Sequence, residues 1–190
     1  MDANTAGGHD LAALLSQRLG IRMLDRELID ELWKNDPEMQ QLAQQYDERP
    51  VNRILSRKIN EFDNSIPHNV AQRQFDMIRQ IADSGESAIF VGRCADHALA
   101  GRPGLLRIFC RADLGLRIRR IEQRHNLSKK KAALLVAKTD RHRRVYYHHH
   151  TGQFWGHSSC YDLTVNTGVL GVEKTAETME AFIRTFWEQD

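Results

Sequence analysis

Arginines placed around a single acid are the residues of this chain whose types and spacing best suit chemistry. Arg141, Arg143 and Arg144 follow Asp140 at the end of a helical segment, and Arg117 lies in the helical segment before it. Guanidinium groups bind phosphate oxygens through paired hydrogen bonds. Phosphoryl transfer needs charge stabilisation more than covalent help from the protein, so converging arginines favour this chemistry.

The positive charge of the chain is concentrated in one segment. Residues 107–144 hold thirteen Lys or Arg and three acids, whereas the rest of the chain holds fourteen and twenty-two. The formal net charge of +2 therefore hides a segment of +10. A solvated basic face, or a nucleic-acid surface on which Tyr146 and Tyr147 stack against bases, would give the same pattern. We favour small phosphate-bearing ligands over nucleic acid.

A glycine turn near the start of the chain is a candidate anion site. Gly7 and Gly8 precede a helical segment at 9–19 that begins with His9 and Asp10. Backbone N–H groups at the start of a helix, together with its dipole, attract an anion. The full P-loop pattern is absent, because no Lys follows the glycines and no Ser or Thr is available for Mg²⁺. A tail leading into an ordinary helix is the alternative.

Charged residues also follow the predicted strands. Arg93 comes after an apolar strand at 88–91, at the sheet edge where ligands bind in open α/β folds. A surface ion pair is the alternative for an isolated arginine. Asp25 and Asp96 lie at strand ends, where they would hold Mg²⁺ or a substrate hydroxyl, or cap the next helix. For Asp162, which precedes its strand, we expect a structural role.

The histidines and cysteines predict no metal site. Consecutive histidines at 148–150 point in different directions on a helix, and neither an acid nor a cysteine completes a ligand set. Cys94, Cys110 and Cys160 form no CxxC pair. We expect three reduced and mostly buried thiols.

The order of helices and strands predicts an α/β fold with a mainly parallel sheet in one domain, 1–190. The predicted helices are 9–19, 27–46, 51–63, 68–84, 113–125, 128–147 and 172–187, and the predicted strands are 21–25, 88–91, 105–110 and 161–167. The strand at 88–91 is expected to be fully buried. Asp113 is expected to cap its helix, and Leu114 and Leu134 are expected to face the core.

Composition and termini exclude several classes of protein. The chain is 27% charged and has a mean hydropathy of −0.55. No apolar run approaches the roughly 18 residues of a membrane span. The first residues have neither a basic start nor an apolar stretch before a cleavage site, so we expect a cytoplasmic protein with no membrane partner.

Several short pieces, taken in order, resemble the cytidylate kinase-like family of P-loop proteins. They are Gly7-Gly8-x-x-Leu11-Ala12, Leu24-Asp25-Arg26-Glu27-Leu28-Ile29, Val91-Gly92-Arg93-Cys94-Ala95-Asp96, Leu116-Arg117-Ile118-Arg119-Arg120-Ile121, Asp140-Arg141-x-Arg143, Tyr146-Tyr147 and Tyr161-Asp162-Leu163-x-Val165-Asn166-Thr167. The pieces span nearly the whole chain. The resemblance implies a three-layer nucleoside monophosphate kinase fold, with a helical monophosphate-binding region at about 27–84 and a lid at about 126–157.

The resemblance also implies an activity and its residues. A kinase of this family would use ATP and Mg²⁺ and move the γ-phosphoryl group to a nucleoside monophosphate such as CMP or dCMP. The residues of the glycine turn that would bind the donor are Gly7, Gly8, His9 and Asp10. Those that would face the acceptor are Asp25, Arg26 and Arg93. Those that would stabilise the transferring group are Arg117, Arg141 and Arg143, oriented by Asp140.

Two departures from the family pattern keep other functions open. Members of the family begin with an apolar strand that leads into the loop, and here Thr5 stands where the first loop glycine would be. We therefore expect the first sheet strand to be missing, either because the true start lies upstream of Met1 or because the loop is degenerate. The alternatives are a non-catalytic nucleotide-binding or regulatory module and a basic nucleic-acid-binding domain.

Overall fold

The structure is a computed structural model that describes residues 5–25 and 68–188. Its helices are α1 (Gly8–Leu19), α4 (His68–Asp83), α5 (Ala95–Ala98), α6 (Leu114–His125), α7 (Lys129–Thr151) and α8 (Thr167–Trp187), with a short 3-10 helix η2 (Ser158–Cys160). Its strands are β1 (Arg22–Leu24), β2 (Ala88–Phe90), β3 (Ile108–Arg111) and β4 (Leu163–Asn166). The predicted elements in these ranges are confirmed. The predicted helices at 27–46 and 51–63, and Arg26, lie outside the described residues.

The described strands form two separate parallel sheets. β1 pairs with β2 so that Leu24 lies opposite Phe90, and β3 pairs with β4 so that Arg111 lies opposite Asn166. The parallel pairing expected from alternating helices and strands is thus confirmed. A single continuous sheet is not seen in this part of the chain, where each sheet has two strands. The three-layer architecture of a P-loop protein is therefore not established by the described strands.

The expectation that strand 88–91 is fully buried is wrong. All three residues of β2 are only half-buried. Among the described strands, β2 has β1 on one side and no strand on the other. A parallel strand becomes fully buried when it has neighbours on both sides and helices on both faces, and β2 lacks the second neighbour.

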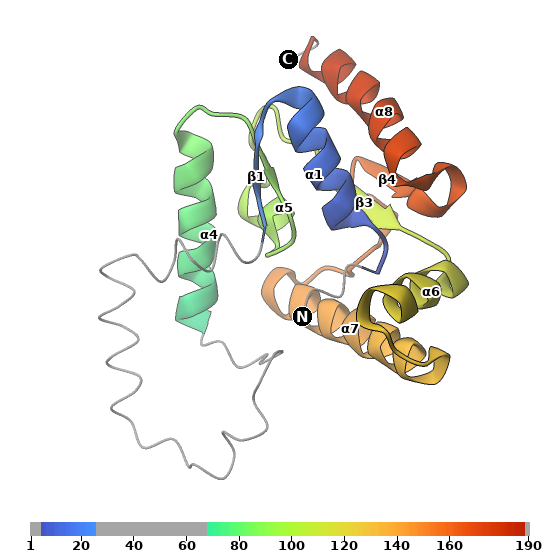
Figure 1. The fold of residues 1–190 in the computed structure, drawn as a ribbon. Coiled ribbons are helices and arrows are strands. Elements are labelled where there is room, and N and C mark those ends of the chain that lie inside the picture. Colours follow the sequence, from blue (N-terminus) through green and yellow to red (C-terminus); the bar gives the residue numbers. More distant parts are fainter. Residues whose placement is uncertain (1–4, 26–67, 189–190) are drawn as a thin grey trace.

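One pair of helices covers both sheets. α1 and α8 lie side by side in Figure 1, and Leu11 and Leu15 of α1 form a buried cluster with Met179 of α8. Ile89 of β2 and Ile108 of β3 both pack against this cluster. Complete burial of a leucine side chain contributes about 2 kcal/mol. Both sheets therefore pack against the same pair of helices, α1 and α8.

The α1 helix ends as its sequence predicts. Gly20 adopts the left-handed conformation, with φ of 68°, and donates its backbone N–H to the Ser16 carbonyl. A left-handed residue in this position closes the last helical turn, and glycine pays no steric cost for it. The chain then enters β1 directly, which brings Asp25 to the end of that strand.

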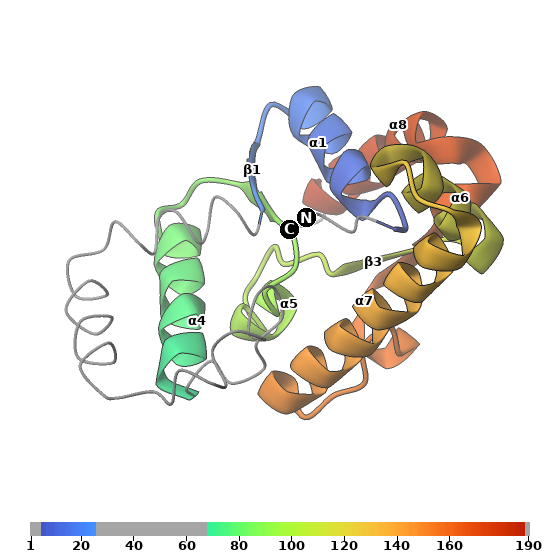
Figure 2. The ribbon, with the colours of Figure 1, turned by 60° about the horizontal axis from the view of Figure 1, so that its bottom comes forward.

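The remaining helices pack around α7. Figure 2 shows α6 and α7 as a helical hairpin, with the far end of α7 reaching α5. Ile121 of α6 packs against Ala132 and Val136 of α7 in one buried cluster. At the other end, Tyr147 joins a cluster with Phe75 of α4 and residues of α5. α7 thus spans the molecule from the α6 hairpin to the β2–α5 connection.

Three expectations about the α6–α7 hairpin are wrong. Leu114 and Leu134 are 59% and 64% exposed. Leu134 lies about 160° around the helix from the buried Val136, so both cannot face the same core. Asp113 stands at the N-cap of α6 in an extended conformation, but its side chain makes no capping hydrogen bond. The carboxylate instead lies 3.8 Å from Nη1 of Arg111.

α7 has 23 residues and is long enough to cross a bilayer, whereas the 21 residues of α8 are interrupted by Gly171, whose backbone is not helical. No helix within residues 5–25 and 68–188 is both long and apolar enough to span a membrane.

Candidate functional site

The predicted site residues gather where the strands end. Asp25 follows β1, Arg93 lies three residues after β2, and Thr167 follows β4. His9 connects the glycine turn to the first of these ends, because its Nε2 lies 3.1 Å from Oδ2 of Asp25. The glycine turn also reaches the end of β4, because the carbonyl oxygen of Ala6 accepts a hydrogen bond from Thr167. The carboxyl ends of both sheets therefore meet at the glycine turn, which is the usual ligand edge of a parallel sheet.

The glycine turn leaves no room for a side chain at its tightest point. Gly7 is left-handed, with φ of 75°. A Cβ atom there would lie 3.0 Å from Nη1 of Arg120 and 3.1 Å from Cγ2 of Val172. A Cβ on Gly8 would lie 3.3 Å from Cβ of Cys110 in β3. The first N–H groups of α1 have no acceptor within the helix, and Gly7 supplies no capping side chain. The turn is thus a backbone cradle of hydrogen-bond donors.

Thr167 and Arg120 fix this cradle from two further elements. The Thr167 side chain is fully buried, and its Oγ1 donates to the Ala6 carbonyl at 2.6 Å. The same oxygen accepts a hydrogen bond of 3.2 Å from Nη1 of Arg120. Sequence reasoning did not assign either residue to the site. Arg120 lies three residues after Arg117 on the same face of α6, and this spacing is a signal that could have identified it. No local pattern marks the Thr167 hydroxyl.

Arg117 is held by the turn and by α7 at once. Its Nε and Nη2 donate to Oγ1 of Thr5 at 3.1 and 2.9 Å, and Nη2 donates to Oδ1 of Asp140 at 2.5 Å. The Arg117 and Asp140 side chains are only 14% and 15% exposed, and Thr5 is fully buried. The predicted pairing of these two residues, a catalytic arginine and its orienting acid, therefore has a geometric basis.

The two other predicted lid cations lie on opposite faces of α7. Arg143 is half-buried, and its Cζ lies 5.9 Å from the ring centroid of Trp155, within reach of a cation–π interaction. Arg141 is exposed. Arg141 and Arg143 are two positions apart, which places them about 200° apart around the helix axis. The two side chains therefore cannot point toward one ligand from a rigid helix. The structure brings Arg117 and Asp140 to the turn and leaves Arg141 on the outside.

Arg93 occupies an unusual stretch of backbone after β2. Arg93 and Cys94 both have positive φ, 56° and 53°, directly after Gly92. Non-glycine residues rarely adopt this conformation, and such strain concentrates at functional sites. The Arg93 side chain is half-buried. Arg26, the third predicted acceptor residue, lies outside the described residues.

Tyr147 joins the lid helix to the Arg93 segment. Its hydroxyl donates to Oδ2 of Asp96 at 2.6 Å and lies 3.1 Å from Oε1 of Gln153. Burial, and then the neighbouring Asp96 carboxylate, raise the pKa of the Tyr147 phenol well above its usual value. Asp96 lies three residues after Arg93, so this hydrogen bond fixes α7 relative to the acceptor side of the site.

Asp162 has the structural role expected for it. Its Oδ2 accepts from the backbone N–H of Arg107 at 2.7 Å, and Oδ1 accepts from Nη2 of the same residue at 2.7 Å. Hydrogen bonding from the Arg107 side chain holds the pKa of Asp162 below its usual value. The pair connects the segment before β3 to the segment before β4 and lies away from the turn.

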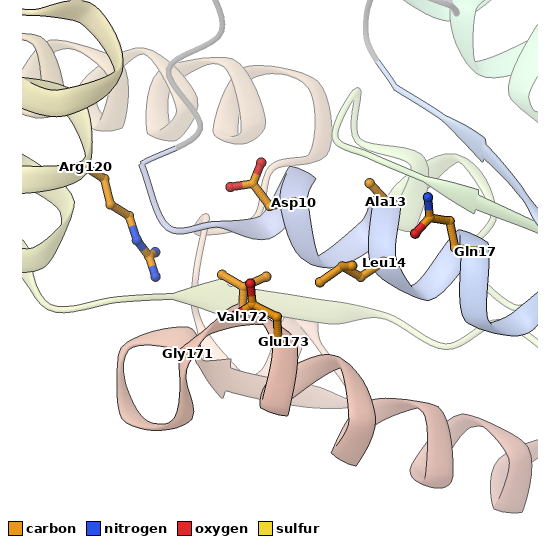
Figure 3. A pocket seen from close by; sticks show the side chains of 8 residues that line it. All are labelled: Asp10, Ala13, Leu14, Gln17, Arg120, Gly171, Val172 and Glu173. Carbon is orange, nitrogen blue, oxygen red and sulfur yellow. The ribbon is translucent and has the colours of Figure 1, made fainter.

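A groove begins beside the turn and runs along α1. It encloses about 610 Å³ between α1, α6 and the start of α8. Its lining is drawn in Figure 3 and consists of Asp10, Ala13, Leu14, Gln17, Arg120, Gly171, Val172 and Glu173. Asp10 also pairs with Arg124, with Oδ2 3.0 Å from Nη2. Arg120 is thus shared by the groove and the turn.

The three consecutive histidines point in different directions, as their spacing predicts. Nδ1 of His148 lies 3.2 Å from the Gln153 carbonyl oxygen, whereas the His150 ring packs against Phe75 and Tyr146. In the described residues, no three His, Cys, Asp or Glu side chains are grouped as metal ligands.

The cysteines are free thiols, as expected. Cys94 and Cys160 are buried and Cys110 is half-buried, and none of them forms a disulfide. Burial raises the pKa of the Cys94 thiol to about 12 and that of Cys110 to about 11. Both thiols are therefore protonated at neutral pH and poorly nucleophilic.

The model of the cytidylate kinase-like family matches residues 3–169. The crystal structure of an uncharacterized protein from Eubacterium ventriosum ATCC 27560 superposes with a TM-score of 0.74 at 25% sequence identity, over 95% of this chain and 92% of that chain. No curated protein matches the sequence. The glycine turn, the arginines that surround it and the family match lead to one conclusion: this chain belongs to the cytidylate kinase-like family.

Proposed function

We propose that this protein is a nucleotide phosphotransferase that moves the γ-phosphoryl group of ATP to a nucleoside monophosphate such as CMP or dCMP. Family membership supports a nucleotide kinase-like function. The observation that carries the proposal is the convergence of Arg117 and Arg120 on the glycine turn, with Asp140 behind Arg117. Backbone donors and guanidinium groups at one point are what a transferring phosphoryl group requires.

We also propose that the two parallel sheets are the two sides of a single P-loop sheet. The shared cluster beneath α1 supports this reading, because Ile89 and Ile108 from different sheets pack against the same helix pair. In such a fold the phosphate-binding turn follows a strand that lies between the other strands. Among the described strands, the second edge of β2 is unpaired, so another strand of such a sheet could pair there.

The donor would bind across the turn and the adjoining groove. The first N–H groups of α1 would contact the phosphates, and Gly7 and Gly8 allow the turn to pack closely against Arg120, Val172 and Cys110. The Arg120 guanidinium lies at the boundary between turn and groove, where it would stabilise the phosphate chain. The base and ribose would occupy the groove along α1.

Mg²⁺ fits this site as an ion carried mainly by the phosphates. Asp10, in the first turn of α1, is the carboxylate that the structure offers beside the cradle. Mg²⁺ is usually bound by one or two carboxylates, several waters and the substrate phosphates. The bound ion would neutralise phosphate charge, and Asp10 would exchange its contact with Arg124 for that role.

The acceptor would bind between the ends of β1 and β2. Arg93, with Arg26, would bind the acceptor phosphate, and Asp25 would orient the nucleotide through its contact with His9. Arg117 and Arg143 would stabilise the transferring group from the hairpin. Arg141 would reach the ligand only through a movement of α7 as a lid, because it now lies on the outside.

A coupled assay of ADP release tests this function. ATP, Mg²⁺ and each common nucleoside monophosphate are supplied in turn to the full chain. We expect turnover with at least one pyrimidine monophosphate, and loss of turnover in Arg117→Ala. Protein that binds ATP but turns over none of the monophosphates would contradict the proposal.

A non-catalytic nucleotide-binding module is the second candidate. The observation in its favour is that Thr5 Oγ1 and Asp140 together occupy Nε and Nη2 of Arg117, which is then engaged by the protein itself. The turn also lacks a lysine. Calorimetry separates the candidates, since tight ATP binding with no transfer to any acceptor favours the module.

A further inference from the structure

The basic segment divides between two faces of α7. The inner face carries Asp140, Arg143 and Tyr147, which contact α6, Trp155 and α5, respectively. The opposite face carries five cations, all exposed. This outer face consists of Lys130, Lys131, Lys138, Arg141 and Arg144. At 100° per residue, the five fall within an arc of about 140°.

Among the described residues, no acid pairs with the outer face. The α7 sequence contains one acid, Asp140, which lies on the inner face and pairs with Arg117. Within residues 5–25 and 68–188, none of the five cations forms an ion pair. A solvated helix face in a globular protein usually mixes both signs of charge. The five unpaired cations therefore give the outer face of α7 a positive electrostatic potential.

The outer face is long enough for an extended ligand. Arg144 lies fourteen positions after Lys130, which corresponds to about 21 Å along the helix axis. Single phosphates or nucleotides would contact only one part of this length. A chain of phosphates contacts all of it, and each neutralised phosphate releases counterions.

An exposed aromatic pair continues the outer face at its C-terminal end. His148 lies four residues after Arg144 on the same face of the helix and is exposed. Its ring stacks on Phe154, with centroids 5.3 Å apart and planes inclined by 14°. The Phe154 side chain is 70% exposed, which is unusual for a large apolar residue. An aromatic ring beside a basic surface is the arrangement on which unpaired bases stack.

We propose that the outer face and the Phe154–His148 pair bind single-stranded nucleic acid without sequence preference. The cations would follow the phosphate backbone, and Phe154 would stack on a base. An anionic membrane fits less well, because Leu134 and Val145 are the only large apolar residues exposed on this face. The apolar side of α7 is packed against α6 and is not available for insertion. The proposal does not depend on catalysis at the glycine turn.

Fluorescence anisotropy of the full chain with a labelled oligothymidylate of about 15 nucleotides tests the proposal. Five phosphate contacts on a single strand predict a slope of about −3.5 for log affinity against log salt. Raising the salt from about 50 to about 200 mM should therefore weaken binding about a hundredfold. No anisotropy change at the lower salt would overturn the proposal.

Variants separate this surface from general positive charge. The triple variant Lys130→Ala, Lys138→Ala, Arg144→Ala should lower the slope by about 2 units. The control removes three exposed cations elsewhere, Arg22→Ala, Arg119→Ala and Lys174→Ala, for the same change in net charge. Equal loss of affinity in both triple variants contradicts the proposal.

Phe154→Ala tests the aromatic part independently. Because stacking is not an ionic contact, this variant should weaken binding about tenfold and leave the salt slope unchanged. Circular dichroism checks that each variant keeps its helices. Vesicles of phosphatidylserine form the second arm of the experiment. Binding to vesicles without binding to the oligonucleotide would assign the outer face to membranes and overturn the proposal.

Discussion

Arg117 of α6 and Asp140 of α7 form an ion pair inside the helical hairpin, with Nη2 2.5 Å from Oδ1. The two side chains are about 85% buried, and the same guanidinium also donates to Thr5 beside the glycine turn. One arginine therefore connects α6, α7 and the glycine turn. Movement of α7 and the position of Arg117 must be coupled through this pair.

Removing the acid of this pair should destabilise the protein strongly. We expect Asp140→Ala to lower the free energy of unfolding by about 3 kcal/mol, because Arg117 would keep a buried charge without its partner. Urea unfolding measures the change. Asp113→Ala, which removes an exposed acid from the same hairpin, should change the stability by less than about 0.5 kcal/mol. Similar losses in the two variants would show that the pair contributes nothing specific.

Gly7 should be irreplaceable for a reason that Gly20 does not share. Both glycines have positive φ, 75° and 68°, so an alanine at either position costs about 1 kcal/mol of backbone strain. Only at Gly7 would the added Cβ approach Arg120 and Val172. We expect Gly7→Ala to abolish ATP binding in calorimetry, whereas Gly20→Ala should leave it unchanged. Equal ATP affinity in the two variants would show that the glycine turn does not bind ATP.

The sequence allowed the positions of Asp25 and Arg93 relative to the strands to be predicted, because strand ends can be located from apolar periodicity. Asp25 follows β1 and Arg93 comes three residues after β2 in the structure. That these residues form a functional site stays a prediction. The Thr167 hydroxyl was not predicted. Its partners, Ala6 and Arg120, are 161 and 47 residues away in sequence, and no local pattern encodes such a contact.

Helix periodicity also has limits in a segment as basic as α7. The run from Ala132 to Val136 contains five apolar residues, and at 100° per residue they cannot all face one side. Ala132 and Val136 are buried, whereas Leu134 is on the outer face. Apolar runs of this length leave the buried face undecided until the neighbouring helix is known.

Alkaline pH should destabilise the protein through Tyr147. Burial and Asp96 raise the pKa of its phenol in the folded state, so the folded protein keeps a proton that the unfolded chain loses. This contribution is complete below about pH 10, the pKa of an unperturbed tyrosine, and is lost as the pH rises further. Urea unfolding between neutral and alkaline pH should show a steeper loss for the wild type than for Tyr147→Phe.

The neutral-pH effect of the same substitution provides a second check. Tyr147→Phe should cost about 1 to 2 kcal/mol at neutral pH, because the Asp96 carboxylate loses a hydrogen-bond donor. Tyr161, whose pKa is raised to about 12 by burial, keeps part of the alkaline dependence in the variant. A variant as stable as the wild type at neutral pH, with an identical alkaline profile, would mean that the Tyr147–Asp96 bond is not formed.

Acid should act through Asp162 in the opposite direction. The Arg107 side chain lowers the folded-state pKa of Asp162, so its stabilising effect is present above the unfolded value of about 3.9 and is lost as the pH falls through the folded value. The two side chains are about one-third exposed, which limits the effect to about 1 kcal/mol. Asp162→Asn should be less stable than the wild type at pH 7 and converge with it in acid. Thermal unfolding at both pH values gives the comparison, and a constant difference would contradict this assignment.

Transfer of a radiolabelled γ-phosphoryl group from ATP to CMP or dCMP, followed by chromatography of the products, tests the central claim most directly. We predict that label enters a nucleoside diphosphate in the presence of Mg²⁺. We also predict that Arg117→Lys, which keeps the charge but loses the paired donors, slows this transfer by about a hundredfold or more. Wild-type protein that binds ATP while no monophosphate acquires label would contradict phosphotransferase activity.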